Sequence, residues 1–315
     1  MKNFKSMASF SLTLLASAVL LAGCLDSSSD SNADTETRNL DLNFLAVNST
    51  SENTDISADV CGANFSRIGT AAVNLTVADM AFYLHDLQLV TKDGQTVPVA
   101  LNTTQWQEEG VALVDFQNKD NRCTGNAKPT NTQVLGEFEH SEGTAYDSVR
   151  FTVGLPSTLN HALPRPTTGI LARTDLQWGW ASGYKFLRMD TYPAGGIANH
   201  NGTTANAWAV HLGSTSCNTE KDAAGNWVTG TTKCDNPYLM QVELNGFDID
   251  RPDIWVDLAA ILAGSDMTQN TGGAVGCMSF DGSPECGPIF SRLGLAYNGI
   301  EGHQAEAQQL FRLAE

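Results

Sequence analysis

The sequence predicts an all-β fold, an antiparallel β-sandwich with a few short helices that is cross-linked by disulfides. Three observations indicate this fold. Short segments of alternating apolar and polar residues recur along the chain, and turn residues separate them. Helical periodicity is confined to two short stretches, and six cysteines follow an apparent export signal. Many short strands with few helices are typical of a sandwich.

The predicted strands begin at residue 73. Residues 73–77 alternate in polarity, and an apolar run over residues 80–90 follows them. Asp93-Gly94 is a hairpin signal because these residue types tolerate the positive φ of a tight turn. We expect the strands at 176–190 and 207–212 to be neighbours joined by a Gly-rich and Asn-rich loop. The remaining strands are predicted at 97–101, 111–116, 148–155 and 239–247.

Helical patterns occur only at residues 256–262 and 304–313. The chain shows no internal repeat and no composition break after its first 39 residues. We therefore predict one β-sandwich domain over residues 40–315.

The N-terminus has the layout of a bacterial lipoprotein signal. Lys2 and Lys5 precede an apolar stretch over residues 10–21 that is too short to span a bilayer stably. Leu21-Ala22-Gly23-Cys24 matches a lipobox, so residues 1–23 are predicted to be removed and Cys24 to carry the lipid. Residues 24–39 form a polar tether. Leu25 replaces the Asp that retains lipoproteins in the inner membrane, which favours the outer membrane, facing the periplasm or the cell surface.

The chain is strongly acidic. Its formal net charge is −17, from 18 basic and 35 acidic residues. The signal contains two lysines and no acidic residue, so the mature chain has a net charge of −19. Such a chain repels nucleic acid and anionic lipid, and neither is expected to be a partner.

Six cysteines remain when Cys24 is assigned to the lipid. An even number in an oxidising compartment predicts disulfides. Short spacing favours two local pairs, and the third pair follows by elimination. No C-x-x-C occurs, which argues against structural zinc and c-type haem. The predicted pairs are Cys217 with Cys234, Cys277 with Cys286 and Cys61 with Cys123.

Several sequence blocks resemble those of a known family. They are residues 81–86 (AFYLHD), 113–116 (LVDF) with Cys123, 151–156 (FTVGLP) leading to 159–161 (LNH), 178–190 (WGWASGYKFLRMD), 211–217 (HLGSTSC) and 277–295. Together they resemble the metallo-mystery pair four-Cys motif family, whose best-known members are MbnP-like copper proteins. More distantly, the chain is similar to copper-repressible surface proteins of methane-oxidising bacteria.

The resemblance implies a copper-binding protein that is not itself a catalyst and that serves copper homeostasis or acquisition. Its site would combine two histidines with a tryptophan oxidised to kynurenine. The oxidant would be a separate di-haem protein of the MauG or cytochrome c peroxidase class. The chemistry is consistent, because imidazole suits copper and intact indole is a poor donor. Ring opening supplies an amine and a carbonyl.

The blocks give the histidines and tryptophans different ranks. His85 and His161 are the expected ligands, with Asp86 or another carboxylate orienting His85. His211 ranks third, because a core or supporting role fits it equally. Trp180 is the favoured modified residue and Trp178 the alternative, since both would share one face of a regular strand. The other histidines and tryptophans are not expected to contribute to the site. The histidines expected in solvent are His140, His200 and His303, and the tryptophans expected in the core are Trp106, Trp208, Trp227 and Trp255.

Other functions remain open on the residues alone. Asp175 and Asp190 could form a glycosidase pair, although the sequence gives no carboxylate separation. Asp115, Asn118 and Asp120 could hold calcium, but the EF-hand pattern is missing. A surface adhesion or carbohydrate-binding lipoprotein is a third interpretation, because sandwiches often serve that purpose. No G-x-S-x-G, H-E-x-x-H or P-loop motif occurs.

Overall fold

The computed structural model describes residues 35–49, 54–55, 60–179, 183–297 and 307–314. The predicted signal, Cys24, Trp180 and His303 lie outside the described residues. From Thr35 onward the chain forms one compact unit around a continuous apolar core. Within the described residues, no helix combines the length and apolar character needed to cross a membrane.

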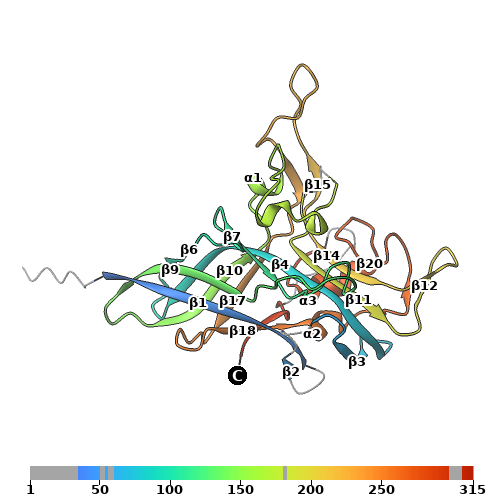
Figure 1. Cartoon of the computed structure of the whole chain (residues 1–315), viewed down its shortest axis with the longest axis horizontal. Coiled ribbons are helices and arrows are strands. Elements are labelled where there is room, and N and C mark those ends of the chain that lie inside the picture. The colour runs from blue at the N-terminus through green and yellow to red at the C-terminus, as the bar shows by residue number, and fades with distance from the viewer. Residues whose placement is uncertain (1–34, 50–53, 56–59, 180–182, 298–306, 315) are drawn as a thin grey trace, which may run out of the picture. The chain divides into compact units, whose positions relative to one another are not determined.

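Two large sheets build this unit (Figure 1). The first has the order β21-β18-β1-β9-β6, with β2 paired to β1. Its strands are β1 (Thr35–Asn48), β2 (Thr54–Asp55), β6 (Ala100–Leu101), β9 (Gln133–Ser141), β18 (Asp253–Asp257) and β21 (Phe311–Leu313). Its pairs are antiparallel except β1 with β18, which run parallel.

The second sheet has the order β17-β10-β4-β11-β14-β20, and four further strands join it through β4 and β8. Its strands are β3 (Asn64–Ile68), β4 (Val73–Thr91), β5 (Thr96–Pro98), β7 (Gln107–Glu108), β8 (Val111–Asp115), β10 (Tyr146–Val153), β11 (Leu187–Pro193), β14 (Trp208–Leu212), β17 (Met240–Asn245) and β20 (Gly276–Cys277). The long strand β4 pairs with β3, β5, β8, β10 and β11. It therefore forms the centre of the sheet.

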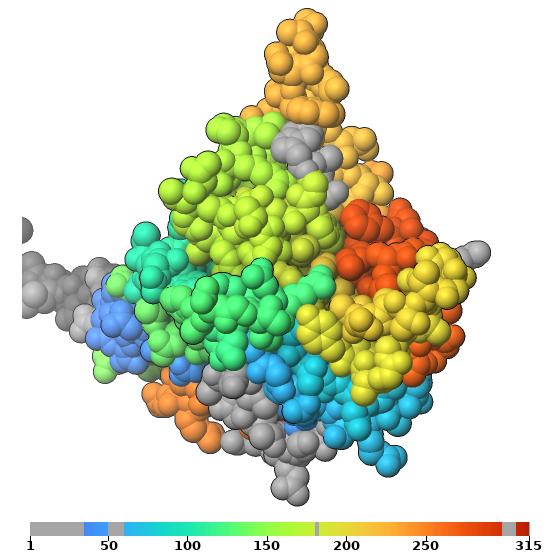
Figure 2. Space-filling view, turned by 45° about the vertical axis from the view of Figure 1, so that its right-hand side comes forward, coloured from blue at the N-terminus to red at the C-terminus, as the bar shows by residue number. Residues whose placement is uncertain are grey.

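Small sheets and short helices complete the fold. One sheet contains β12 (Ile197–Asn199), β13 (Thr204–Ala205) and β19 (Gln269–Asn270), and another contains β15 (Thr215–Asn218) and β16 (Lys233–Asn236). The helices are α1 (Ser157–Asn160), η2 (Ile170–Ala172), η3 (Thr174–Leu176), α2 (Leu258–Leu262) and α3 (Cys286–Arg292). The chain that joins β15 to β16 projects beyond its neighbours (Figures 1 and 2).

Aromatic side chains fill the space between the two large sheets. Phe44 on β1 makes edge-to-face contacts with Phe82 on β4 and Phe151 on β10, at ring-centroid distances of 5.4 and 5.8 Å. Phe311 on β21 packs against the same rings. Phe44 and Phe82 are completely buried. Edge-to-face pairs of this kind add to the stabilisation from burial, so the predicted sandwich is confirmed.

Two segments of the chain differ from the predicted strands and helices. Residues 176–190 form a strand only from Leu187, because η3 and a loop that Trp178 N–H closes on the Gly183 carbonyl occupy the earlier part. Trp178 therefore lies outside any strand, and Trp180, which was expected to share its face, lies outside the described residues. The helix predicted over 304–313 is also wrong where the chain is described, since β21 pairs with β18 there.

The edges of the domain and two predicted side-chain environments also differ. Strand β1 begins at Thr35, inside the predicted tether, because its first residues pair with β9. His140 is buried rather than solvated, and its Nδ1 lies 3.0 Å from the Tyr146 hydroxyl. Trp227 is 44% exposed and packs on the Lys221 ammonium instead of entering the core. The sequence alone does not show that Tyr146 on β10 covers His140, or that Trp227 lies on the connection between β15 and β16.

The three predicted disulfides are all present. Cys61–Cys123 joins the start of β3 to the loop after β8, and Cys217–Cys234 joins β15 to β16. Cys277–Cys286 joins β20 to α3. The two local pairs are the ones that the spacing favours, and the third is the one left by elimination.

Candidate metal centre

His85 lies on β4 at a β-bulge. Asp86 has a φ of 53°, and the pairing of β4 with β10 shifts register at this point. A bulge of this kind redirects a side chain from its strand. His85 is consequently half-buried, whereas the eight residues before it are fully buried.

The protonation of His85 follows from its neighbour. Its Nδ1 lies 3.0 Å from the Gly154 carbonyl oxygen, which can only accept, so Nδ1 carries the proton and Nε2 the lone pair. Burial lowers the pKa of His85, although the bond to Gly154 and the charge of Asp86 oppose the shift. A backbone carbonyl therefore fills the orienting role that the sequence assigned to a carboxylate. Asp86 instead accepts from the Gln88 amide.

His161 ends the short helix α1. The Ser157 carbonyl accepts its backbone N–H, and the side chain is 7% exposed. Burial lowers the pKa of His161, and the nearby charge of Arg165 lowers it further. The ring is therefore neutral at pH 7 and able to act as a ligand.

Asn160 determines which nitrogen of His161 is free of its proton. The backbone N–H of Tyr184 donates to Asn160 Oδ1 at 2.8 Å, which fixes the orientation of the amide. Asn160 Nδ2 must then donate to His161 Nε2, 2.9 Å away. Nε2 therefore carries the lone pair. Asn160 is itself buried.

Three chain segments that carry predicted site residues meet near His85 on β4. They are the part of β4 around His85, the segment from Gly154 to His161 and the segment that contains Gly183. Gly154, which binds His85, lies directly before the turn that enters α1 and ends at His161. Gly154 has a φ of 140°, and a Cβ there would lie 2.5 Å from a Leu239 methyl carbon. Gly183 closes the loop after Trp178, and a Cβ there would lie 2.2 Å from Asn160 Oδ1. Both glycines permit close approach of these segments.

Trp178 packs at the base of that loop and remains partly exposed to solvent. Its ring is half-buried, lies 5.3 Å from the Phe280 ring and covers Gly213, where a Cβ would be 2.5 Å from Trp178 Cζ3. This is the environment of a packing residue. Trp180, the favoured modified residue, lies outside the described residues.

His211 occupies a different environment. It lies on β14 opposite Arg188 of β11, as the predicted pairing of these segments requires. Its Nε2 lies 2.8 Å from Asp190 Oδ1, and the side chain is 4% exposed. Burial lowers the pKa of His211 and outweighs the opposing effect of Asp190, so a neutral ring donates Nε2–H to the carboxylate. This geometry favours the core role for His211.

Asp190 belongs to a buried charge network between β4, β8 and β11. Arg188 binds Asp190 at 2.8 Å and Asp79 at 3.0 Å, and Arg173 binds Asp115 at 2.7 Å. Burial alone would raise the pKa of Asp190, but the His211 hydrogen bond and the charge of Arg188 hold it well below its usual range. Burial raises the pKa of Asp79 to about 7 against the opposing charge of Arg188.

The network bears on two alternative functions. Asp175 and Asp190 both pair with Arg188, and Asp175 also pairs with Arg173 at 2.6 Å. A carboxylate held ionised in this way is a poor general acid. Asp115 Oδ2 is shared by Arg173 and Lys128, which leaves little negative charge for calcium. A cavity of about 640 Å³ opens beside these cations, away from His85 and His161.

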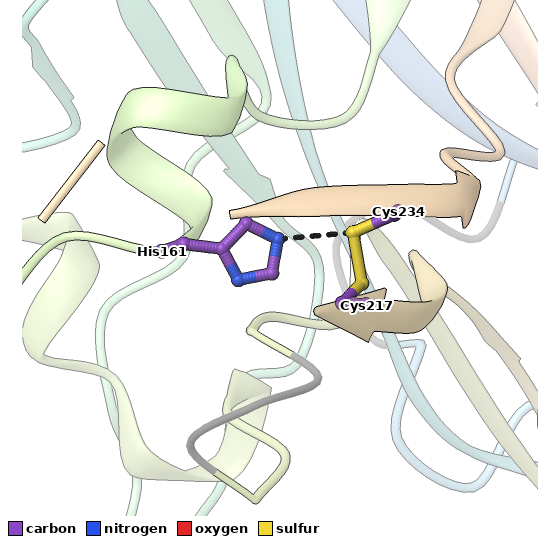
Figure 3. A group of neighbouring side chains, drawn as sticks. All are labelled: His161, Cys217 and Cys234. Atoms are coloured by element: carbon purple, nitrogen blue, oxygen red, sulfur yellow. Dashed lines mark hydrogen bonds between the residues drawn. A yellow bond between two sulfur atoms is a disulfide. The ribbon is translucent and has the colours of Figure 1, made fainter. Parts of the chain in front are cut away.

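His161 also lies against a disulfide. Its Nε2 is 3.3 Å from the Cys234 sulfur, and the ligand atoms of His161, Cys217 and Cys234 all lie within 4.8 Å of one another (Figure 3). Both sulfurs are joined to each other, so neither is a thiolate in this state. A cavity of about 280 Å³ lies at this point.

Comparison with known proteins bears on the meaning of this site. A family model described as MbnP matches residues 37–279, which include His85, His161, the second large sheet and most of the first, but not β21. The chain belongs to the MbnP family. The solved structure of MbnP from Methylosinus trichosporium is similar, with a TM-score of 0.71 and 25% identity. The match covers 88% of this chain and 98% of that one. Comparison with curated proteins gives no match.

Membership of the MbnP family accounts for the sequence blocks but not for all of the residues that shape the site. Asn160 and the Gly154 carbonyl fix the two imidazoles, and neither residue was expected to contribute to the site. Asn160 directly precedes His161 in the chain, which is the one signal that could have found it. The role of Gly154 could not be predicted from the sequence, because every residue has a backbone carbonyl that can accept a hydrogen bond.

Proposed function

We propose that the chain is an exported copper-binding lipoprotein whose ligands are His85, His161 and a kynurenine formed from Trp180. The observation that carries the proposal is the state of the two imidazoles. Both rings are neutral and neither Nε2 carries a proton. His161 Nε2 accepts from the Asn160 amide, a hydrogen bond that copper would replace. The segments that carry the two rings meet beside the Trp178–Gly183 loop. Neutral imidazole is a ligand that suits copper.

The residues fit a copper ion in two further ways. The Nδ1–H of His85 donates to a carbonyl, which is the common way in which proteins hold a metal-binding histidine. His161 lines a cavity together with Asn160 and Ser214, so space for a ligand exists beside it. A kynurenine would supply an amine or a carbonyl as a third donor.

The tryptophan requires an outside oxidant. Cleavage of the indole C2–C3 bond with two oxygen atoms taken from water releases four electrons and four protons and gives N-formylkynurenine. Hydrolysis by a further water then removes C2 as formate and leaves the free amine. We propose a di-haem protein of the MauG or cytochrome c peroxidase class as the partner that withdraws the electrons. The chain itself would then be a binding protein for copper homeostasis or acquisition, not a catalyst.

The location of the protein follows from the N-terminal signal. We propose that Cys24 is acylated and that Leu25 directs the protein to the outer membrane, facing the periplasm or the cell surface. Three disulfides fit an oxidising compartment. The polar tether would hold the sandwich away from the lipid.

The test is copper stoichiometry of the protein coexpressed with the di-haem partner. Tight binding should be lost in His85→Ala and in Trp180→Phe, because each removes one ligand. Trp178→Phe is the matched control, since it changes a packing ring at the base of the same loop. Mass spectrometry of the loop peptide should locate kynurenine at Trp180. Tight stoichiometric binding by Trp180→Phe would refute this ligand set.

A second interpretation is a surface carbohydrate-binding or adhesion lipoprotein. The observation in its favour is the exposed Trp227 on the projecting β15–β16 connection, since aromatic rings often stack on sugars. The Lys221 ammonium already covers one face of that ring at 4.2 Å. A glycosidase is less favoured, because the acidic side chains of the predicted pair are held by arginines. Glycan-array binding that Trp227→Ala abolishes would support the second interpretation.

A further inference from the structure

The disulfide beside His161 has features that structural cross-linking does not require. Cys217 and Cys234 lie directly opposite each other on β15 and β16, and both side chains are partly exposed. The Cys234 sulfur lies 3.3 Å from His161 Nε2 (Figure 3). Cys277 and Cys286, by contrast, are fully buried.

The contact between the histidine and the sulfur is a close approach of two electron-rich atoms. The Asn160 amide donates to Nε2, so the ring nitrogen has no proton to offer. The disulfide sulfur has none either. The imidazole lone pair accepts from Asn160, and a metal bound at Nε2 beside the sulfurs would replace that hydrogen bond. The grouping of His161 with Cys217 and Cys234 is suited to a metal cation when the two sulfurs are negatively charged thiolates.

Reduction would supply that charge. A disulfide sulfur is a weak ligand, whereas a cysteine thiolate is a strong one. Two thiolates and one imidazole form a soft donor set that selects Cu(I) or zinc. The present separation of 3.3 Å between Nε2 and the Cys234 sulfur is close to the ~3.6 Å expected for N and S ligands on one metal with bonds of ~2.0 and ~2.3 Å. The two sulfurs must separate, and Nε2 must exchange its hydrogen bond from Asn160 for the metal.

The hairpin has contacts that do not depend on the disulfide. The hydroxyls of Thr219 and Thr232 lie 2.7 Å apart, and the Glu220 backbone N–H donates to the Thr231 hydroxyl at 3.0 Å. Asn236 bonds both β15 and the segment that contains Asp281. The two cysteines should therefore stay opposite each other after the bond is broken. The adjoining cavity of about 280 Å³ gives the ion and a fourth ligand room.

We propose that Cys217, Cys234 and His161 form a thiol-gated Cu(I) site that exists only when the disulfide is reduced. Two electrons and two protons convert the disulfide into two thiols. A dithiol reductant of the oxidoreductase class supplies them and becomes a disulfide itself. Each thiol then releases its proton to solvent as the sulfur binds copper. The site does not need kynurenine, but it shares His161 with the proposed function, so reduction would draw copper from one ligand set to the other.

The experiment compares oxidised and reduced protein without the di-haem partner. Protein with its three disulfides is treated anaerobically with a phosphine and titrated with Cu(I) against a chromophoric chelator. Reduced protein should bind one tight equivalent that oxidised protein lacks, and X-ray absorption should show copper–sulfur bonds. Cys217→Ser/Cys234→Ser should abolish this equivalent. His161→Ala should weaken it by more than about tenfold, the loss that even outer-shell substitutions cause.

Two controls separate this site from the other thiols and from the proposed function. Cys61→Ser/Cys123→Ser removes a partly exposed disulfide that has no grouped histidine among the described residues, and it should keep the reduced-state equivalent. His85→Ala should also keep it, while losing copper in oxidised, partner-treated protein. An unchanged equivalent in Cys217→Ser/Cys234→Ser would overturn the proposal, as would a preference for Zn(II) over Cu(I).

A measurement on the unsubstituted chain covers the case in which the double variant does not fold. Reduced protein is alkylated with and without Cu(I), and peptide mass spectrometry locates the labels. Copper should protect Cys217 and Cys234 and leave Cys61 and Cys123 open to label. Equal labelling of all four cysteines in the presence of copper would overturn the proposal.

Discussion

Gly183→Ala should separate the packing of the tryptophan loop from the chemistry of its ligands. Gly183 has a φ of 71°, and a Cβ there would lie 2.2 Å from Asn160 Oδ1. The alanine would push the Asn160 amide away from the Tyr184 N–H that fixes it. His161 would then lose the donor that sets its protonation. One methyl group should therefore disturb a ligand that it does not touch.

The magnitude has two parts. Holding an L-residue in the left-handed region costs about 1–2 kcal/mol. Leaving the buried Tyr184 N–H without an acceptor costs about 1–3 kcal/mol. The free energy of unfolding should fall by about 2–5 kcal/mol, since the two effects act at different groups. Copper affinity should fall less than in His161→Ala, because the imidazole is retained and only the hydrogen bond to its Nε2 is lost.

The assay is urea unfolding of the oxidised protein, followed by copper titration of partner-treated protein. Gly179→Ala is the matched control, because it lies in the same loop without a positive φ and a Cβ there would meet nothing within 4 Å. Its stability should change by less than about 0.5 kcal/mol. Equal stability of the two variants would show that Asn160 does not depend on close approach at Gly183.

Four further outcomes follow from the structure and the sequence. Copper affinity should stay constant as pH falls to about 6.5 and should decline only below that value. The reason is that burial lowers the pKa of His85 and His161, so protons compete with copper only at lower pH. A competition titration in which the affinity already falls above pH ~7 would contradict this prediction. Arg188→Met should lower the free energy of unfolding by about 3–5 kcal/mol, because it removes the ion pair of the buried Asp79 carboxylate and one of the ion pairs of Asp190. Arg150→Met, at an exposed pair, should change it far less in the same urea series. Cys24→Ala should release the protein from membranes, and membrane fractionation that finds it still bound would rule out lipid at that residue. Thiol titration of the folded, lipidated protein without reductant should find no free thiol, and two or more would be incompatible with three disulfides.

Local patterns predicted the strands whose side chains alternate or form long apolar runs. Strand β4 followed from the run over 73–90, and its hairpin to β5 from Asp93-Gly94. Strand β1 was missed, because its first half is polar and only pairing with β9 extends it. The strand predicted over residues 176–190 begins only at Leu187, although the residues before it include many apolar side chains. Trp178 in this segment packs on Gly213 and Phe280 from outside any strand, and sequence spacing does not distinguish this arrangement from a strand.

The sequence by itself determined the class of fold and the family, and its short spacings favoured two of the three disulfide pairs, because each depends on residue types and local spacing. The pairing of Cys61 with Cys123 followed only by elimination, and the tertiary structure decided it. The sequence also ranked His85 and His161 through blocks of neighbouring residues. Only the tertiary structure decided their protonation, since the Gly154 carbonyl and the Asn160 amide come from other elements. It likewise placed His211 with Asp190 and set the Cys217–Cys234 disulfide beside His161. These contacts join residues distant in the chain, and their geometry is set by how the sheets pack, which no local pattern records.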